Sequence, residues 1–252
     1  SFSDGGMIAD AESGLRQAER LIAEGADILD VGGESSRPGA GPVPLKEELR
    51  RVIPLIRRIS READVPVSVD TAKAEVARQA IDAGAEIVND VTALRGDRKM
   101  ARIVAEAGVP VILMHMRGTP RTMQKGDLVY RSLLGELLRF LSERVGHAVE
   151  AGIPPDRIMV DPGIGFGKTA EQSIAVLARL DRLTSFGLPL LVGASRKRFI
   201  DWVSPAEPQA RLGGSIAAHL IAAENGAAII RTHDVAPTIQ ALRVAQAIRS
   251  RR

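Results

Sequence analysis

Short runs of aliphatic residues alternate with longer amphipathic stretches from one end of the chain to the other. Each run is rich in Val, Ile and Leu and is bounded by Gly, Pro or polar residues, as is typical of buried strands. Several of the longer stretches end at glycine, a common helix stop signal. The pattern predicts seven strands, at Ala26–Val31, Val65–Asp70, Ala85–Asn89, Val109–His115, Arg157–Asp161, Leu188–Gly193 and Ala227–Arg231. It predicts eight helices, near residues 10–24, 44–62, 71–82, 97–107, 131–151, 169–186, 207–225 and 236–249.

Strict alternation of strands and helices indicates a parallel sheet. Eight helices in 252 residues match one (β/α)8 TIM barrel, and we expect residues 1–252 to form a single domain. The helix near 10–24 has no strand before it, so we expect a barrel whose first strand is absent from this chain. A doubly wound open sheet is the alternative, but no G-x-G-x-x-G motif follows the first run.

Composition narrows the class of protein. Aromatic residues make up only 3% of the chain, so the core is built from aliphatic side chains, which suits parallel strands. The net charge is +3, and the charged residues of both signs are interleaved along the predicted helices, so we expect no nucleic-acid partner. The absence of Cys excludes disulfides and Cys-ligated metals. No apolar run approaches the ~20 residues that span a membrane, and no signal-like segment begins the chain. We therefore expect a cytoplasmic protein without a membrane partner.

Nearly every predicted strand ends in a side chain that can do chemistry. The carboxyl ends of barrel strands form one mouth, where active sites gather. Polar strand ends that merely border water would explain one or two of these side chains, but not a set that combines carboxylates, an amide and cations. We predict that one mouth contains Asp70, Asn89, Asp161, Lys197, Arg231 and His233.

The residue types suggest a ligand. Carboxylate and amide groups such as Asp70, Asn89 and Asp161 suit a heterocycle that carries both donors and acceptors, of the aminopyrimidinone type. Arg231 and His233 precede the last helix and suit a phosphate or diphosphate, while Lys197 suits either ligand.

A glycine-rich stretch follows the fifth strand, at Asp161–Lys168. Its glycines permit close approach of the backbone to a ligand, and we expect Phe166 to cover a planar ring. The stretch resembles a P-loop, but Pro162 stands where a P-loop needs glycine, which disfavours ATP binding. No spacing of His, Asp or Glu predicts a zinc site.

Eight motifs in consecutive order resemble the dihydropteroate synthase family of pterin-binding enzymes. They are Ser1–Gly6, Asp30–Gly39, Ser68–Thr71, Asn89–Val91, Leu113–Gly118, Asp161–Lys168, Gly193–Lys197 and Arg231–Val235. The resemblance implies a transferase of folate biosynthesis that condenses 6-hydroxymethyl-7,8-dihydropterin diphosphate with p-aminobenzoate, giving 7,8-dihydropteroate and diphosphate. It also implies inhibition by sulfonamides, Mg2+ as the cofactor that neutralises the diphosphate, and a homodimer formed through helices near the end of the chain.

The resemblance assigns roles by motif. It implies catalytic roles for Asp70, Asp161 and Lys197, and a pterin pocket completed by Asn89, Met114 and Phe166. It implies that Arg231 and His233 anchor the diphosphate, and that Asp4 lies on a loop that closes over diphosphate and metal. The p-aminobenzoate subsite would contain Ser36, Arg37, Pro38, Phe2, Ser195 and Lys197. Ser36 stands where the family usually has Thr, so the hydroxyl is retained.

In the family, a strand ending in an Asn that helps to hold metal and diphosphate normally precedes the first motif. We therefore expect this chain alone to be poorly active. Three alternatives remain: a pterin-dependent methyltransferase on the same barrel, a non-catalytic pterin-binding paralogue, and an unrelated phosphate-binding isomerase barrel. The retained Arg37, Lys197, Arg231 and His233 favour the synthase.

Overall fold

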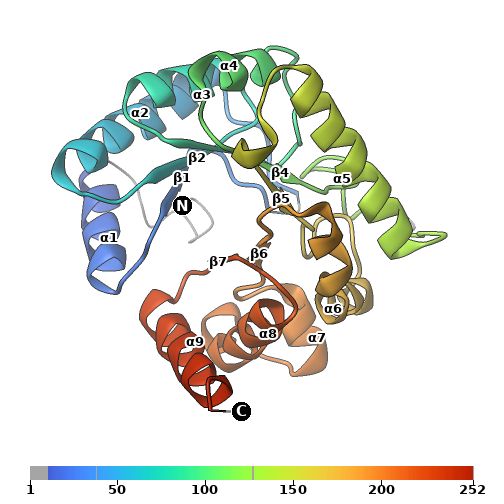
Figure 1. Cartoon of the computed structure of the whole chain (residues 1–252). Coiled ribbons are helices and arrows are strands. Elements are labelled where there is room, and N and C mark those ends of the chain that lie inside the picture. Colours follow the sequence, from blue (N-terminus) through green and yellow to red (C-terminus); the bar gives the residue numbers. More distant parts are fainter. Residues whose placement is uncertain (1–10, 38, 127, 252) are drawn as a thin grey trace.

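A computed structural model describes residues 11–37, 39–126 and 128–251, so Phe2, Asp4 and Pro38 lie outside the described residues. Strands occupy the centre of the molecule and helices surround them (Figure 1). Each described strand overlaps one predicted run. The strands are β1 Leu29–Gly32, β2 Val67–Asp70, β3 Ile87–Asp90, β4 Val111–Met114, β5 Ile158–Asp161, β6 Leu191–Gly193 and β7 Ile229–Arg231.

The strands follow one another in chain order and run parallel. Strands β1 to β5 form one sheet, and β6 pairs with β7. A single bridge between Val160 and Leu190 connects the two sheets. Within the described ranges β7 and β1 share no ladder of backbone hydrogen bonds, but an ion pair joins them, with Arg231 Nε 2.7 Å from Asp30 Oδ2. This arrangement is the parallel α/β barrel that the sequence predicted.

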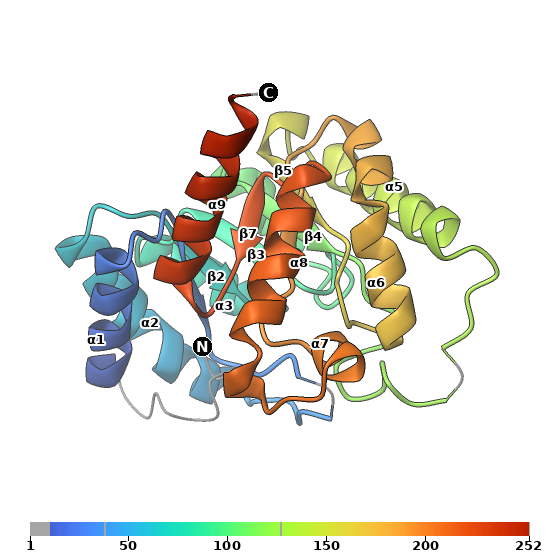
Figure 2. The same ribbon diagram turned by 90° about the horizontal axis from the view of Figure 1, so that it is seen from below.

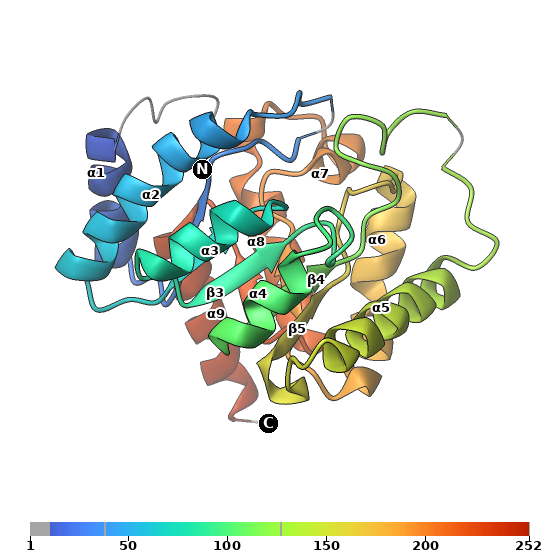
Figure 3. The ribbon, with the colours of Figure 1, turned by 90° about the horizontal axis from the view of Figure 1, so that it is seen from above.

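The helices cover the outside of the strands. Figure 2 shows α6, α8 and α9 on one side, and Figure 3 shows α2 to α5 on the opposite side. None of the helices in the described residues is long and apolar enough to cross a membrane. The helices are α1 Ala11–Ala23, α2 Leu45–Glu62, α3 Ala74–Asp82, α4 Met100–Ala107, α5 Leu133–Glu150, α6 Ala170–Ala178, α7 Arg198–Val203, α8 Leu212–Glu224 and α9 Val235–Arg249.

The prediction of eight helices was wrong by one, because the described residues contain nine α-helices. The additional helix, α7, has only six residues, too few for an apolar repeat to be visible in the sequence. The helix predicted over 169–186 is divided into α6 and a 3-10 helix, Leu180–Phe186. Thr169 and Gln172 form a capping box that starts α6 directly after the glycine-rich loop.

Side chains inside the barrel form two layers of opposite chemistry. Four residues from different strands pack together as an aliphatic layer, against which Ile28 and Ile229 also pack: Ile87, Ile112, Met159 and Leu191. Side chains alternate along a strand, so residues two positions further on share the inner face, one step closer to the carboxyl end. We call these the mouth layer: Asp30, Asn89, Met114, Asp161, Gly193 and Arg231. On β2 the corresponding pair is Ser68 and Asp70.

Candidate active site

Strand register brings the polar strand ends together. Asp70 pairs with Asn89 across β2 and β3, and Met114 pairs with Asp161 across β4 and β5. Arg231 extends from β7 toward β1 and β2, with Nη2 3.6 Å from Asp70 Oδ2. One mouth therefore contains the predicted carboxylates, the amide and the arginine.

Asp30 is the centre of this network, and sequence reasoning gave it no role. It accepts a hydrogen bond from Arg231 Nε at 2.7 Å and a longer one from Asn89 Nδ2 at 3.3 Å. The signal was present in the sequence, because Ala26, Ile28 and Asp30 alternate along the first predicted strand and place a carboxylate on its inner face. A charged residue inside a buried strand is rare unless it is paired.

Electrostatic coupling at the mouth favours a ligand rich in donors. Burial and the negative charge of Asp30 raise the pKa of Asp70 to about 7, and Arg231 opposes that shift. Burial also raises the pKa of Asp161, against the effect of Lys197. The charge of Asp30 raises the pKa of Arg231 above its ordinary value despite burial. Carboxyl groups held in this way gain most from a ligand that donates hydrogen bonds or carries positive charge.

The loop from β5 to α6 holds Lys197. Asp161 Oδ1 accepts from the Gly163 N–H at 2.7 Å, which fixes the start of the loop. Lys197 Nζ donates to the carbonyl of Ile164 and lies 4.5 Å from the centre of the Phe166 ring. Burial lowers the pKa of Lys197 to about 8, and Asp161 opposes the shift. Phe166 and Met114 belong to one apolar cluster beside the mouth.

The loops after β6 and β7 are joined by side chains. Ser195 Oγ lies 2.9 Å from His233 Nδ1. Arg196 makes a two-pronged ion pair with Asp234, at 3.0 and 2.6 Å. Arg196 has φ +57°, a conformation that is costly for a residue with a side chain, and the ion pair helps to offset that cost. These contacts hold Lys197 and His233 on neighbouring loops.

The structure does not connect every predicted residue to the mouth. Ser36 and Arg37 lie on the loop after β1, and no hydrogen bond or ion pair in the described ranges joins their side chains to the mouth layer. The base of that loop is anchored by buried Glu48, which accepts from Thr71 Oγ1 at 2.6 Å. Lys73 bridges Glu48 to Glu34 on the loop itself. Sequence reasoning missed this anchor because its members lie on separate elements.

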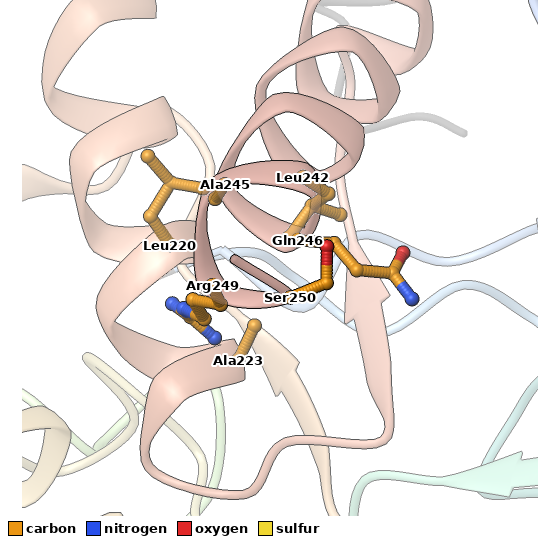
Figure 4. A pocket seen from close by; sticks show the side chains of 7 residues that line it. All are labelled: Leu220, Ala223, Leu242, Ala245, Gln246, Arg249 and Ser250. Atoms are coloured by element: carbon orange, nitrogen blue, oxygen red, sulfur yellow. The ribbon is translucent and has the colours of Figure 1, made fainter. Parts of the chain in front are cut away.

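A pocket of about 480 Å³ lies away from the mouth, between α8 and α9 (Figure 4). Its lining is largely apolar and contains Leu220, Ala223, Leu242, Ala245, Gln246, Arg249 and Ser250. This lining lacks the carboxylates and amide that the mouth offers, so the mouth is the better candidate for chemistry.

Comparison with known proteins identifies the class. The description of the family that matches residues 1–233 is pterin binding enzyme. The chain belongs to this family. Among curated relatives, the dihydropteroate synthase of a Synechocystis species is 46% identical over 250 residues, covering 98% of this chain and 86% of that protein. The dihydropteroate synthase of Escherichia coli is 44% identical over 247 residues, covering 98% and 87%.

Solved structures agree in fold and narrow the class to the synthases. The Yersinia pestis dihydropteroate synthase with a sulfonamide drug complex has a TM-score of 0.95 and 41% identity, covering 100% of this chain and 90% of that one. The Xanthomonas albilineans dihydropteroate synthase with 4-aminobenzoic acid has a TM-score of 0.90 and 48% identity, covering 98% and 88%. The predicted barrel class is thereby confirmed.

Proposed function

We propose that this chain condenses 6-hydroxymethyl-7,8-dihydropterin diphosphate with p-aminobenzoate, giving 7,8-dihydropteroate and diphosphate as a transferase of folate biosynthesis. The relatives named dihydropteroate synthase support this activity. Relatives have also been solved with 4-aminobenzoic acid and with 7,8-dihydropteroate. The observation that carries the proposal is the single mouth that contains Asp70, Asn89, Asp161, Lys197 and Arg231.

The pterin ring is assigned to the mouth layer. Its amino and ring N–H groups would donate to the carboxylates of Asp70 and Asp161, and the amide of Asn89 would supply both a donor and an acceptor. Phe166 and Met114, which share one apolar cluster, would cover the ring face. Lys197 stands beside Phe166 and would donate to a ring acceptor.

The reaction needs electrostatic stabilisation and no covalent nucleophile. The C–O bond between the exocyclic methylene carbon and diphosphate breaks, and its electron pair leaves with diphosphate, so positive charge spreads from the methylene into the pterin ring. The arylamine nitrogen then bonds to the methylene carbon and releases a proton. The carboxylates of Asp70 and Asp161 would stabilise that charge from a buried position. Exclusion of water from the mouth would prevent capture of the cation.

Arg231 and His233 are proposed to hold the diphosphate, beside the N-terminus of α9. Arg231 is paired with Asp30 in the structure, so the diphosphate would compete with a carboxylate for it. The described residues contain no group of three or more His, Cys, Asp or Glu that could hold a metal ion. We therefore assign Mg2+ no site of its own, and propose only that it arrives bound to the diphosphate of the substrate.

The remaining assignments stay proposals. Ser36, Arg37 and Pro38 would form the p-aminobenzoate subsite with Ser195 and Phe2, and Asp4 would lie over the diphosphate. We also propose a single domain and a cytoplasmic homodimer. Exposed aliphatic side chains on α8 and α9 support the homodimer, since three of them are exposed by 45% or more: Ile221, Val244 and Ile248. The pocket in Figure 4 opens between the same two helices.

Calorimetric titration tests the proposed function. We expect p-aminobenzoate to bind only when diphosphate and a pterin are present, because the arylamine subsite is completed by the bound first substrate. Binding to the bare protein, unchanged by diphosphate, would count against the synthase. A turnover assay with Mg2+ and both substrates accompanies the titration, and formation of 7,8-dihydropteroate is the expected result.

A further inference from the structure

Two buried titratable side chains near the mouth have no place in the proposed chemistry. Lys168 is only 2% exposed and His115 only 4%. Lys168 Nζ lies 2.8 Å from His115 Nδ1, 2.9 Å from the carbonyl oxygen of Gly163 and 3.2 Å from that of Phe166. Burial lowers the pKa of Lys168 to about 7, and its side-chain nitrogen has three hydrogen-bond partners here.

The geometry fixes the direction of two of these three hydrogen bonds. Because both carbonyl oxygens only accept, the lysine donates to them, and a third hydrogen bond joins its Nζ to His115 Nδ1. An ammonium would donate to Nδ1 of a neutral ring that carries its proton on Nε2, and a neutral amine would accept from Nδ1–H. Burial and the nearby charge of Lys168 lower the pKa of His115 to about 3, in agreement with a neutral ring. His115 is itself fixed, since its backbone N–H donates to the carbonyl of Asp161 at 2.8 Å.

The loop around Lys168 is the one that holds Lys197. Gly163, Gly165 and Gly167 have φ values of +64°, +80° and +65°, which turn successive carbonyl groups in different directions. The carbonyls of Gly163 and Phe166 point inward to Lys168. The carbonyl of Ile164, between them, accepts from Lys197. Lys168 therefore fixes the residues on both sides of the Lys197 contact.

The outer side of the same loop has other donors. Gln124 Nε2 donates to the carbonyl of Gly165 at 2.7 Å, and Tyr130 Oη donates to that of Gly167 at 2.7 Å. Within the described residues, Lys197 donates no hydrogen bond to either of these two carbonyls and donates instead to that of Ile164. The loop is therefore held from two sides, by buried Lys168 on the inside and by Gln124 and Tyr130 on the outside.

We propose that Lys168, held by neutral His115, is a positioning residue that shapes the β5–α6 loop so that the Ile164 carbonyl and the Phe166 ring place Lys197 against the pterin. The inference rests on the proposed function, because it concerns how the pterin end of that site is assembled. Lys168 itself does not touch the reacting atoms. It acts through the loop, and its loss should weaken pterin binding more than p-aminobenzoate binding.

The test uses Lys168→Met, which keeps the bulk of the side chain and removes its three hydrogen bonds. We expect the affinity for 7,8-dihydropteroate, measured by calorimetry, to fall by about 10- to 100-fold, the range for loss of a hydrogen bond to a charged group. We expect the KM for the pterin diphosphate to rise by a similar factor while the KM for p-aminobenzoate changes less than about threefold. A purely structural role would lower the amount of active protein and leave both KM values unchanged.

Three further variants complete the test. His115→Asn keeps a polar side chain that can donate or accept and should retain affinity within about threefold, whereas His115→Leu removes the hydrogen-bond partner and should resemble Lys168→Met. Tyr130→Phe removes one outer donor and is the matched control, with an expected change below about threefold.

The proposal is overturned if Lys168→Met binds dihydropteroate as the unmodified chain does. If that variant does not fold by circular dichroism, the His115 pair decides, and equal affinities for the Leu and Asn variants would overturn it. Equal losses in Tyr130→Phe and Lys168→Met would show that any contact to the loop suffices, and would also overturn it. Failure of the unmodified chain to bind dihydropteroate would instead refute the proposed function.

Discussion

The two layers inside the barrel come from the same strands and the same face, yet one is largely aliphatic and the other contains most of the charged groups. The aliphatic layer contains Ile87, Ile112, Met159 and Leu191. The mouth layer, two positions further along, contains coupled charges whose pKa values are displaced. Burial of apolar surface stabilises the aliphatic layer, whereas burial of carboxylates costs free energy in the mouth layer. Two positions along a strand therefore separate residues that stabilise the fold from residues that we propose take part in the chemistry.

The largest effect is expected at the mouth. Asp161→Asn removes a buried carboxylate that we place against the developing cation, so kcat/KM should fall by about 10²- to 10³-fold. The free energy of unfolding should stay the same or increase, because a costly buried charge is gone. Steady-state kinetics and urea unfolding measure the two quantities. Asp156→Asn is the matched control, an exposed carboxyl at the other end of β5. Comparable losses in both variants would refute the special role of Asp161.

The opposite result is expected in the aliphatic layer. Ile112 is 3% exposed, and Ile112→Ala should lower the free energy of unfolding by about 2–5 kcal/mol through lost burial and a cavity. Activity per folded molecule should change by less than about threefold, since no reacting group moves. Urea unfolding measures the free energy of unfolding, and active-site titration gives the activity per folded molecule. Loss of activity with unchanged stability would contradict the assignment of the aliphatic layer to stability alone.

The pH dependence of stability gives a third comparison. Asp70 loses its proton near its ordinary pKa of 3.8 in the unfolded chain, but near 7 in the folded protein. Between these values the folded state holds the extra proton, so stability falls as pH rises through this window.

Asp70→Asn should remove that decline. Between pH 5 and pH 8 the stability of the unmodified chain should fall by about 2–3 kcal/mol more than that of the variant, the equivalent of roughly two pKa units. Urea unfolding at the two pH values measures the difference. An equal change of the free energy of unfolding with pH in both proteins would mean that the pKa of Asp70 is not raised on folding.

The smallest effect concerns a polar residue at the level of the aliphatic layer. Ser68 pairs in register with Ile87 and is 2% exposed, and its hydroxyl has no hydrogen-bond partner in the described part of the structure. Ser68→Ala should raise the free energy of unfolding by about 1 kcal/mol, because the desolvated hydroxyl is removed. Thermal unfolding detects this change, and a destabilisation would indicate that the hydroxyl is satisfied in solution.

Sequence reasoning reached the barrel class and the gathering of polar strand ends because both follow from local pattern. Alternating runs define strands, and parallel strands place their ends at one mouth. Asp70, Asn89 and Arg231 were found in this way, although their roles stay predictions.

What the sequence did not reveal depends on contacts between distant segments. The pairing of Lys168 with His115 joins positions 53 residues apart, and Asp30 became visible only when Arg231 and Asn89 were seen to converge on it. Neither pattern nor propensity specifies which buried cation meets which acceptor. Helix α7 was missed for a different reason, because six residues carry too little periodicity.

The ion pair between Asp30 and Arg231 affects the order in which the protein folds. The two residues are 201 positions apart, so their contact closes nearly the whole chain into one loop. Bringing such distant segments together is entropically costly until the intervening elements have packed. We therefore expect the mouth to assemble late in folding, so that recovery of ligand binding after dilution from denaturant lags behind recovery of helical circular dichroism.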